Sequence, residues 1–191
     1  MEPRLVLASA SPRRARILES LGIPFKVVAS DVDETIDDGE EAAEAAGRLA
    51  HDKAQAVAGR ERLPVLAADT LVVCGGRILG KPASGEDAAR MLRLLSGRSH
   101  EVVTGVCLVK DGVPTSGVER TTVTFAPITE AEIAWYVASG EPLDKAGAYH
   151  VDGLGALFIE AVSGSPSNVE GLPVRLVLEL AREAGVSLDL P

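Results

Sequence analysis

The sequence has few basic residues, few cysteines and no long apolar run. Its 19 Lys and Arg residues are outnumbered by 28 Asp and Glu residues, which gives a formal net charge of −9. This balance excludes non-specific binding to nucleic acid or to an anionic membrane surface. No stretch approaches the ~18 apolar residues of a membrane span, and the segment after Met1 has no secretory signal pattern. We therefore expect a cytoplasmic protein with no nucleic-acid or membrane partner.

The two cysteines give no sign of a disulfide or a metal site. Cys74 and Cys107 lie in separate apolar, strand-like runs, and neither belongs to a Cys-x-x-Cys motif. This context predicts two buried free thiols.

Strand-like and helix-like patterns alternate along the 191 residues. No linker, repeat or low-complexity tract interrupts them, so we expect one domain over 1–191. The mixture predicts an α/β fold with a mixed twisted sheet and flanking helices. Expected strands start at residue 5 and run over 25–29, 64–73, 102–109, 118–125 and 157–162; expected helices run over 12–21, 40–58, 84–96, 130–139 and from 173.

The first strand-to-helix turn carries the pattern of an anion site. Ser11 suits an N-cap, Pro12 the first helical position, and Gly22 the position after the last one. A helix N-terminus attracts anions through its amide groups and its dipole. Two hydroxyls and two guanidinium groups suited to a phosphate chain lie at this turn: Ser9, Ser11, Arg13 and Arg14. The alternative is an ordinary turn with solvated arginines.

An acidic segment follows the second predicted strand. Asp31, Asp33 and Thr35 match the D-x-D-x-T nucleophile motif of the haloacid dehalogenase family. The later acidic pair that such enzymes use for Mg²⁺ has no convincing counterpart here. A plain solvated acidic loop is a further alternative.

Asp69 interrupts the apolar run 64–73, together with Thr70. A carboxylate among apolar residues is unfavourable unless it is paired, hydrogen-bonded or bound to a metal. Asp69 is therefore the strongest catalytic candidate; the alternative is an Asp that caps a turn at a strand bend.

Two other segments have simpler explanations. The helix predicted over 40–58 has an apolar side and a polar side, and Arg48, His51, Asp52 and Lys53 are assigned to the polar one. The run from Gly75 to Lys81 starts like a P-loop, but Pro82 replaces the Ser or Thr that would bind Mg²⁺. We interpret Gly75-Gly76 as a hairpin turn instead.

Two further features of the middle of the chain are predicted as structural. Thr129 and Glu132 form a capping box at the start of the helix over 130–139. Trp135 and Tyr136 on that helix are expected to pack rather than to stack on a substrate, and His100 is expected to be structural.

Several segments, taken together, resemble the Maf family of nucleotide pyrophosphatases over nearly the whole chain. They are Ser9-Ala10-Ser11-Pro12-Arg13-Arg14, the acidic loop with Glu34, the helix segment with Lys53, Ala67-Ala68-Asp69-Thr70, Gly80-Lys81-Pro82, the Gly-rich run 144–156 and Asn168-Val169-Glu170-Gly171-Leu172-Pro173. The resemblance implies an elongated, two-lobed Maf/ITPase-like fold with a central cleft.

The resemblance also implies a reaction and its site. Asp69 would be catalytic, and Glu34 with Asp69 would hold a divalent metal cation, Mg²⁺ or Mn²⁺. Metal-assisted attack of water at the α-phosphorus of a nucleoside triphosphate would release pyrophosphate and leave the monophosphate. The implied substrate-binding residues are Ser9, Ser11, Arg13, Arg14, Lys53, Thr70, Lys81 and Asp152.

The base preference rests on two features. Thr70 and the run 144–149 resemble the subgroup that acts on dTTP and UTP. That subgroup usually has Gln at the position of Asp152, and an ionised carboxylate cannot donate to O4 of a pyrimidine. Three alternatives therefore stay open: a 7-methyl-GTP pyrophosphatase, an enzyme for other modified nucleotides, and a nucleotide-binding regulator of septum formation with little turnover. A homodimer also stays open.

Overall fold

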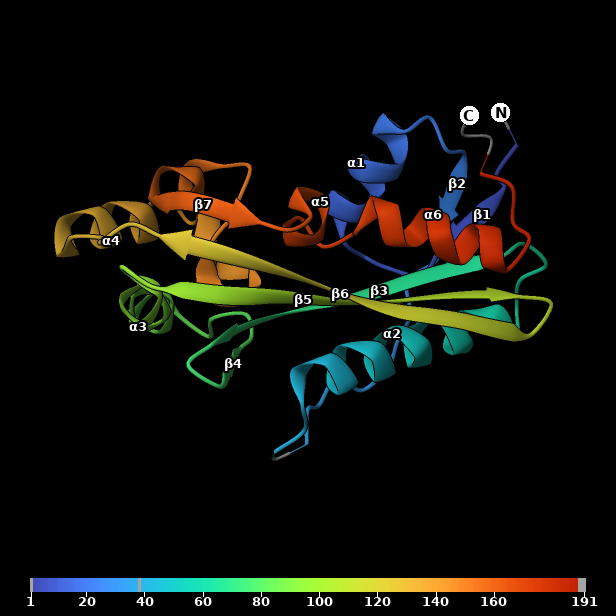
Figure 1. The fold of residues 1–191 in the computed structure, drawn as a ribbon, viewed down its shortest axis with the longest axis horizontal. Helices are drawn as coiled ribbons and strands as arrows, with labels where there is room; N and C mark the ends of the chain where they lie inside the picture. Colours follow the sequence, from blue (N-terminus) through green and yellow to red (C-terminus); the bar gives the residue numbers. More distant parts are fainter. Residues whose placement is uncertain (1, 38, 189–191) are drawn as a thin grey trace. The chain divides into compact units, whose positions relative to one another are not determined.

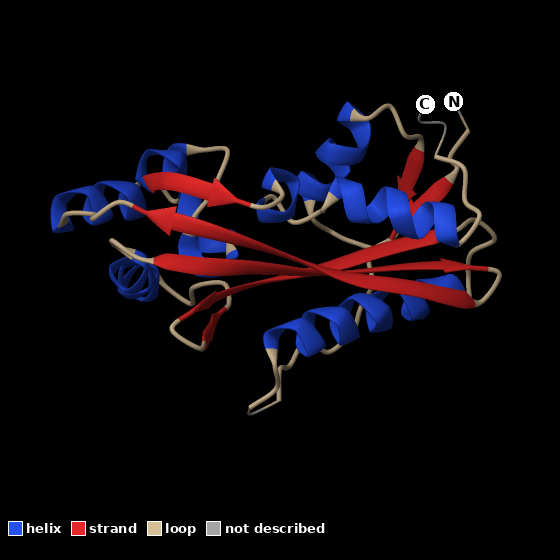
Figure 2. Ribbon diagram, viewed as in Figure 1, coloured by secondary structure: helices blue, strands red, loops and turns tan. Residues whose placement is uncertain are grey.

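The computed structural model of the chain describes residues 2–37 and 39–188. Within these residues helices flank a seven-stranded sheet of order β2-β1-β3-β5-β6-β7, and β4 pairs with β3 (Figures 1 and 2). β1 pairs in parallel with β2 and β3, whereas the β3–β4 and β6–β7 pairs are antiparallel. The predicted α/β class with a mixed sheet is therefore confirmed. No helix in these ranges has both the length and the apolar content that a bilayer crossing requires.

The expected strands and helices are all present, although β5 and β6 begin three and five residues before their expected starts. The strands are β1 (Leu5–Leu7), β2 (Phe25–Val27), β3 (Val65–Cys74), β4 (Arg77–Leu79), β5 (Ser99–Lys110), β6 (Val113–Phe125) and β7 (Ile159–Ser163). The helices are α1 (Pro12–Ser20), α2 (Ala42–Ala58), α3 (Gly85–Leu95), α4 (Glu130–Ala138), α5 (Pro166–Val169) and α6 (Val174–Glu183), with short 3₁₀ helices η1 (Glu141–Asp144), η2 (Ala146–Ala148) and η3 (Leu154–Phe158).

The chain folds into two compact units. The first contains Met1–Asp69, Thr104–Glu119 and Gly171–Pro191, and the second contains Thr70–Val103 and Arg120–Glu170. Each unit has its own core, and the two are described in turn.

In the first unit, β1 and the first half of β3 are buried on both faces. Alternate residues of β1 and β3 therefore point into two different apolar cores. Leu5, Leu66 and Ala68 belong to the core under α1 and α6. Val6 and Ala67 belong to the core under α2. Figure 1 shows α2 on one side of β1 and β3, with α1 and α6 on the other.

The helix α2 lies unusually close to the sheet because the residues between them are small. A Cβ atom added at Gly105 of β5 would lie 2.1 Å from the carbonyl oxygen of Ala46. The predicted apolar face of α2 is confirmed, because these residues are all buried: Ala42, Ala45, Ala46, Leu49, Ala50, Ala54 and Val57. The helix backbone thus contacts the sheet directly, and side chains of α2 reach β3 with little freedom.

The second unit is built around an aromatic core. The rings of Phe125 and Tyr149 are 4.8 Å apart, and those of Tyr136 and Phe158 are 5.2 Å apart, both edge to face. His100 packs against Phe125, and its Nε2 lies 2.9 Å from the hydroxyl of Tyr149. The structural role predicted for His100 is confirmed.

One predicted cap is confirmed, and three predictions differ from the structure: the cap at Ser11, the packing of Trp135 and the start of the last strand. The capping box of Thr129 and Glu132 is confirmed. Ser11 occupies the N-cap position of α1, but its side chain makes no capping bond. Trp135 is 48% exposed, against the packing role predicted for it, because α4 buries Ile133 and Tyr136 instead. The strand predicted from residue 157 begins at Ile159, since the preceding residues form η3.

The glycine turns and thiols follow the predictions. Gly75 and Gly76 both have positive φ, as the hairpin between β3 and β4 requires. A P-loop is excluded because β4 occupies the run that would form the phosphate-binding loop. Cys74 and Cys107 are both buried and free.

Protonation of His100 should destabilise the fold at acidic pH. Burial lowers the pKa of His100 from 6.5 to about 4, and its Nδ1 is buried without a hydrogen-bond partner among the described residues. Between these two pH values the unfolded chain binds a proton that the folded chain does not. The free energy of unfolding should therefore fall by about 3 kcal/mol as the pH drops from 6.5 to 4.

Urea unfolding of the wild type and of His100→Gln across this pH range measures the effect. The difference between the two pH dependences isolates His100 from the carboxylates, which titrate in both proteins. Parallel curves would contradict the assignment.

Candidate functional site

The turn between β1 and α1 is held together by Arg14. Its Nη1 donates to Ser9 Oγ at 3.1 Å, and its Nε donates to the carbonyl oxygen of Gly171 at 2.8 Å. The backbone N–H of Ser11 also donates to Ser9 Oγ, at 3.2 Å. Ser9 and Arg14 are both buried, whereas Ser11 and Arg13 are partly exposed. Part of the predicted phosphate-binding set therefore shapes the turn itself.

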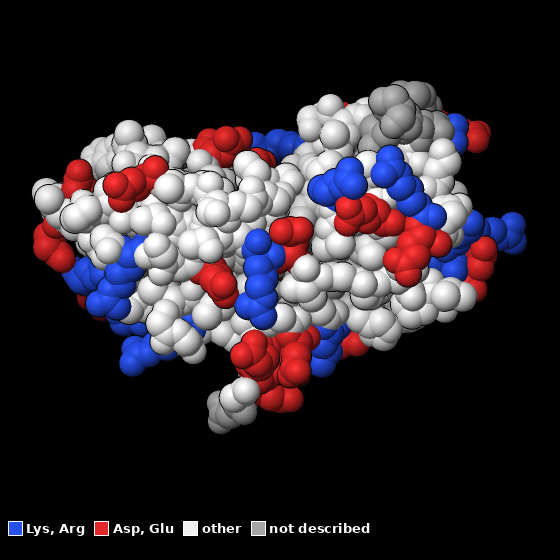
Figure 3. Space-filling view, in the orientation of Figure 1, with Lys and Arg blue, Asp and Glu red and all other residues white. Residues whose placement is uncertain are grey.

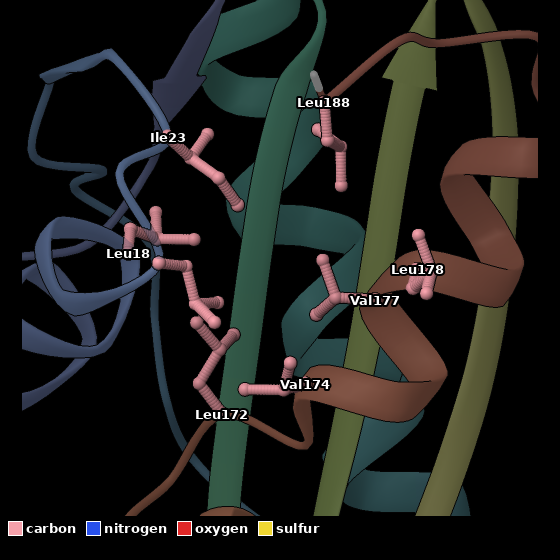
Figure 4. Close-up of a pocket in the computed structure, with 8 residues that line it drawn as sticks. Leu18, Ile23, Leu172, Val174, Val177, Leu178 and Leu188 are labelled. Atoms are coloured by element: carbon pink, nitrogen blue, oxygen red, sulfur yellow. The ribbon is translucent and has the colours of Figure 1, made fainter. Parts of the chain in front are cut away.

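Apolar packing fixes α1 in the position that these contacts require. Leu18, one turn after Arg14, lies against an apolar crevice (Figure 4). Its other lining residues come mainly from the stretch after Gly171 and from α6: Leu21, Ile23, Leu172, Val174, Val177, Leu178 and Leu188. The same face of α1 thus anchors the helix and directs Arg14 toward Gly171.

A buried ammonium lies at the centre of the candidate site. Lys53 Nζ donates to Asp69 Oδ1 at 2.5 Å and contacts Glu34 Oε1 at 2.8 Å. The side chains of Lys53 and Asp69 are 8% and 9% exposed, whereas that of Glu34 is 61% exposed. The structure thus brings together three residues that the sequence analysis selected from three separate motifs.

The alternation of β3 explains why Asp69 meets Lys53. Val65 and Ala67 face α2, so Asp69, two residues later, faces it as well. Lys53 lies at helical spacing from the buried residues Ala50 and Val57, which puts it on the inner side of α2. Its assignment to the polar side was wrong, because the spacing of its buried neighbours already placed it on the apolar one.

The charges of this site act on Arg14. Burial lowers the pKa of its guanidinium, Asp69 raises it, Arg13 lowers it and Glu34 raises it, in decreasing order of effect. The guanidinium therefore lies within electrostatic range of both carboxylates. Arg14 thus interacts electrostatically with acidic residues of two other motifs of the first unit.

The loop that carries Glu34 is ordered by its own polar contacts. Asp33 Oδ1 accepts from the backbone N–H of Thr35 at 2.9 Å and from its hydroxyl. These bonds lower the pKa of Asp33. Arg48 of α2 donates to Glu40 and to the carbonyl oxygen of Thr35. Asp33 is thus engaged in a local turn, and the dehalogenase interpretation gains no support.

The acidic character of this region is visible on the surface. Figure 3 shows Asp and Glu side chains gathered around the segment that leads into α2. The acidic residues of this segment that are described are Asp31, Asp33, Glu34, Asp37, Glu40, Glu41 and Glu44. A phosphate chain would meet an unfavourable field here without the nearby cations.

The donor set fits a hard divalent cation. Glu34 and Asp69 both contact Lys53 Nζ, so their carboxylates are close neighbours. Among the described residues, no group of three or more His, Cys, Asp or Glu side chains could hold a metal ion. Mg²⁺ commonly uses one or two carboxylates and completes its shell with water and substrate phosphates. The two carboxylates match that requirement.

The remaining candidates belong to the second unit. The backbone N–H of Gly147 donates to the carbonyl oxygen of Gly80 at 3.1 Å, which joins the Gly-rich loop to the residue before Lys81. A Cβ atom at Gly147, where φ is +70°, would lie 2.9 Å from Val72 of β3. Three predicted segments, after Thr70, around Lys81 and over 144–152, therefore meet in this unit. Lys81 and Asp152 are exposed.

Some residues of both units lacked a sequence signal. Nothing in the sequence indicated that the Gly171 carbonyl would orient Arg14, because a backbone acceptor has no residue type. Glu141, at the start of η1, accepts hydrogen bonds from Tyr136 and from the backbone of Leu154 and Gly155. A glutamate just after the end of a helix has no sequence pattern that marks it as the anchor of a distant loop.

Comparison with known proteins relates the whole chain to one family. The model of the family described as "Maf-like protein" matches residues 4–184. A dTTP/UTP pyrophosphatase of Anaeromyxobacter dehalogenans is 52% identical over 192 residues, covering 98% of this chain and 97% of the relative. One of Deinococcus radiodurans is 48% identical over 186 residues, covering 97% and 95%.

Among solved structures, the Staphylococcus aureus Ham1 protein has a similar fold. The TM-score is 0.54 at 15% identity, over 96% of this chain and 99% of that one. At this identity the likeness concerns the fold alone, and it agrees with the predicted architecture. The family match over residues 4–184 and the identity of about one residue in two to full-length relatives show that this chain belongs to the Maf family.

Proposed function

We propose that this chain is a nucleoside triphosphate pyrophosphatase that hydrolyses dTTP and UTP to the monophosphate and pyrophosphate. The observation that carries the proposal is the buried contact of Lys53 with Asp69 and Glu34, beside Arg14 and the start of α1. Two full-length relatives with about half of their residues identical are named dTTP/UTP pyrophosphatase.

In this proposal Asp69 is the general base. Water attacks the α-phosphorus, the bond to the oxygen that bridges the α- and β-phosphorus breaks, and pyrophosphate leaves with that oxygen. Asp69 takes the proton that the water loses. Lys53 orients the carboxylate of Asp69 through its 2.5 Å contact. An ammonium has three donors, so Lys53 can meet an oxygen of the α-phosphate as well.

The cations of the site bind the phosphate chain. Arg13 and Ser11 lie at the first turn of α1, where the helix dipole also favours negative charge. Arg14 and Ser9 hold this turn in shape and add positive charge behind it. Lys81, from the second unit, is assigned to the departing pyrophosphate.

We further propose that Glu34 and Asp69 hold a divalent cation, Mg²⁺ or Mn²⁺. Such an ion, when bound, neutralises charge on the phosphate oxygens and orients the attacking water. The chain supplies the two carboxylates and keeps them together through Lys53.

Thr70 and Asp152 are assigned to the nucleoside. Asp152 can accept from N3–H of a pyrimidine but donates nothing to O4. This mismatch keeps a modified nucleotide, such as 7-methyl-GTP, as the second candidate substrate. A small nucleotide is the only partner that the proposal needs. We also propose that the enzyme acts in the cytoplasm, where the buried thiols Cys74 and Cys107 stay reduced.

Replacement of Asp69 should abolish turnover. With Mg²⁺ or Mn²⁺ and a panel of triphosphates, the wild type should release pyrophosphate, fastest from dTTP or UTP. Asp69→Asn should lower kcat about 10³-fold because it removes the general base. Glu160→Gln, on the exposed strand β7, is the matched control and should leave kcat unchanged.

The products separate the alternatives. Release of orthophosphate instead of pyrophosphate would favour a different phosphohydrolase, and tight binding without turnover would favour a regulator. Undiminished kcat in Asp69→Asn would refute the assigned base.

Removal of the buried cation should reduce the stability of the fold. Lys53→Met leaves the buried Asp69 carboxylate without its cation, which should lower the free energy of unfolding by about 3 kcal/mol. The control Lys26→Met breaks an ion pair with Glu61 in which the lysine side chain is 42% exposed, so the loss should stay below about 1 kcal/mol. Urea unfolding compares the two. Equal losses would contradict the burial argument.

Asp152→Gln tests the proposed contact with the base. The amide restores a donor for O4 while it keeps an acceptor for N3–H. One added hydrogen bond of about 1 kcal/mol should lower KM for dTTP and UTP about fivefold. Initial rates with both nucleotides measure KM, and 7-methyl-GTP serves as the reference substrate. A rise in KM for the pyrimidine nucleotides would contradict the proposal, because it would show that aspartate binds the pyrimidine better than glutamine at this position.

A further inference from the structure

A single carboxylate gathers three donors in the second unit. Glu141 Oε1 accepts from the hydroxyl of Tyr136 at 2.8 Å and from the backbone N–H of Gly155 at 3.0 Å. Its Oε2 accepts from the backbone N–H of Leu154 at 3.0 Å. A carboxylate with several donors is a strong and directional anchor. Glu141 thus fixes the start of η3 to the end of α4.

Tyr136 extends the anchor to the other end of the loop. Its hydroxyl oxygen accepts from the backbone N–H of His150 at 3.0 Å while the hydroxyl donates to Glu141. The Tyr136 side chain is fully buried, and burial is the main cause that raises its pKa. The phenol therefore stays protonated and keeps donating. Both ends of the segment 150–155 are held by one tyrosine–glutamate pair.

The glycines of this segment show how tight the contact is. A Cβ atom at Gly153 would lie 2.4 Å from Glu141 Oε2. One at Gly155 would lie 2.8 Å from the hydroxyl oxygen of Tyr136. At Gly155 an added Cβ atom would also lie 2.7 Å from the backbone carbonyl oxygen of His150, so glycine is required there. At Gly153 a side chain would displace the carboxylate of Glu141. This part of the loop is shaped around Glu141.

Asp152 lies inside the anchored segment. It is two residues after His150 and two before Leu154, whose amides are the bonded ones. Its own side chain is exposed. The hydrogen bonds of its neighbours His150 and Leu154 therefore determine where its backbone lies.

We propose that Glu141 is a positioning residue that sets the base preference of this enzyme, by holding the loop that presents Asp152. The inference rests on the proposed function, because it concerns how that same site selects its nucleotide. Glu141 makes no contact with the reacting groups in this account. Its loss should therefore weaken and broaden nucleotide binding without slowing the chemical step.

Kinetics of Glu141→Ala and Glu141→Gln with a nucleotide panel test this inference. Glu141→Ala should raise KM for dTTP and UTP about tenfold, with kcat within about threefold of the wild type, and should reduce the preference for them over GTP. Glu141→Gln keeps a carbonyl oxygen that can accept from part of the donors. Its KM for dTTP and UTP should lie between those of the wild type and Glu141→Ala. Hydrogen exchange should become faster at the amides of His150, Leu154 and Gly155 in Glu141→Ala.

Thr129→Ala is the matched control for a loss of stability alone. Thr129 caps α4, the helix that carries Tyr136, but it makes its capping contacts with Glu132. This variant should lower Tm while KM and the base preference stay those of the wild type. Equal kinetic effects in Thr129→Ala and Glu141→Ala would overturn the inference, as would an equal loss of kcat for every nucleotide.

The outcomes also separate this inference from the proposed function. A wild type that releases no pyrophosphate from any triphosphate would overturn both. An active wild type whose base preference is unchanged by Glu141→Ala would overturn the positioning role alone.

Discussion

The ammonium of Lys53 is the constraint on which the candidate site depends. It lies between Asp69 and Glu34, and with Asp69 it is nearly excluded from solvent. Neither charge would be tolerated there alone, since a buried ion without a partner is strongly unfavourable. The pair thus fixes α2 against β3 and at the same time keeps in place the carboxylate that is assigned to catalysis. Structural stability and the proposed chemistry share one contact.

Small residues make that contact possible. Ala46 and Gly105 bring the backbone of α2 onto the sheet, at a distance that no larger side chain would allow. A lysine on this face then reaches β3 directly. On the opposite face, Leu18 and its apolar neighbours hold α1 so that Arg14 meets Gly171. Lys53 and Arg14 are therefore both oriented by apolar packing that has no chemical role in the proposal.

In the second unit, side-chain contacts hold an irregular loop in one conformation. The loop has no sheet partners between Tyr149 and Phe158. It is held instead by Tyr136 and Glu141, by the glycines that let its backbone approach them, and by an aromatic core beneath it. Such an arrangement can tune recognition without altering the groups assigned to catalysis.

The sequence by itself determined most of the elements and selected the side chains that are assigned to catalysis. Apolar alternation, caps and glycine turns predicted the strands, the helices and the mixed sheet, and Asp69 stood out because a carboxylate is unfavourable in an apolar strand. Tertiary structure decided the partners. That Lys53 is buried against Asp69, that Arg14 is tied to a backbone carbonyl 157 residues away and that Glu141 holds a loop all depend on contacts between distant segments. Local periodicity carries no information on such contacts, because it records which side of an element faces inward but not what it meets there.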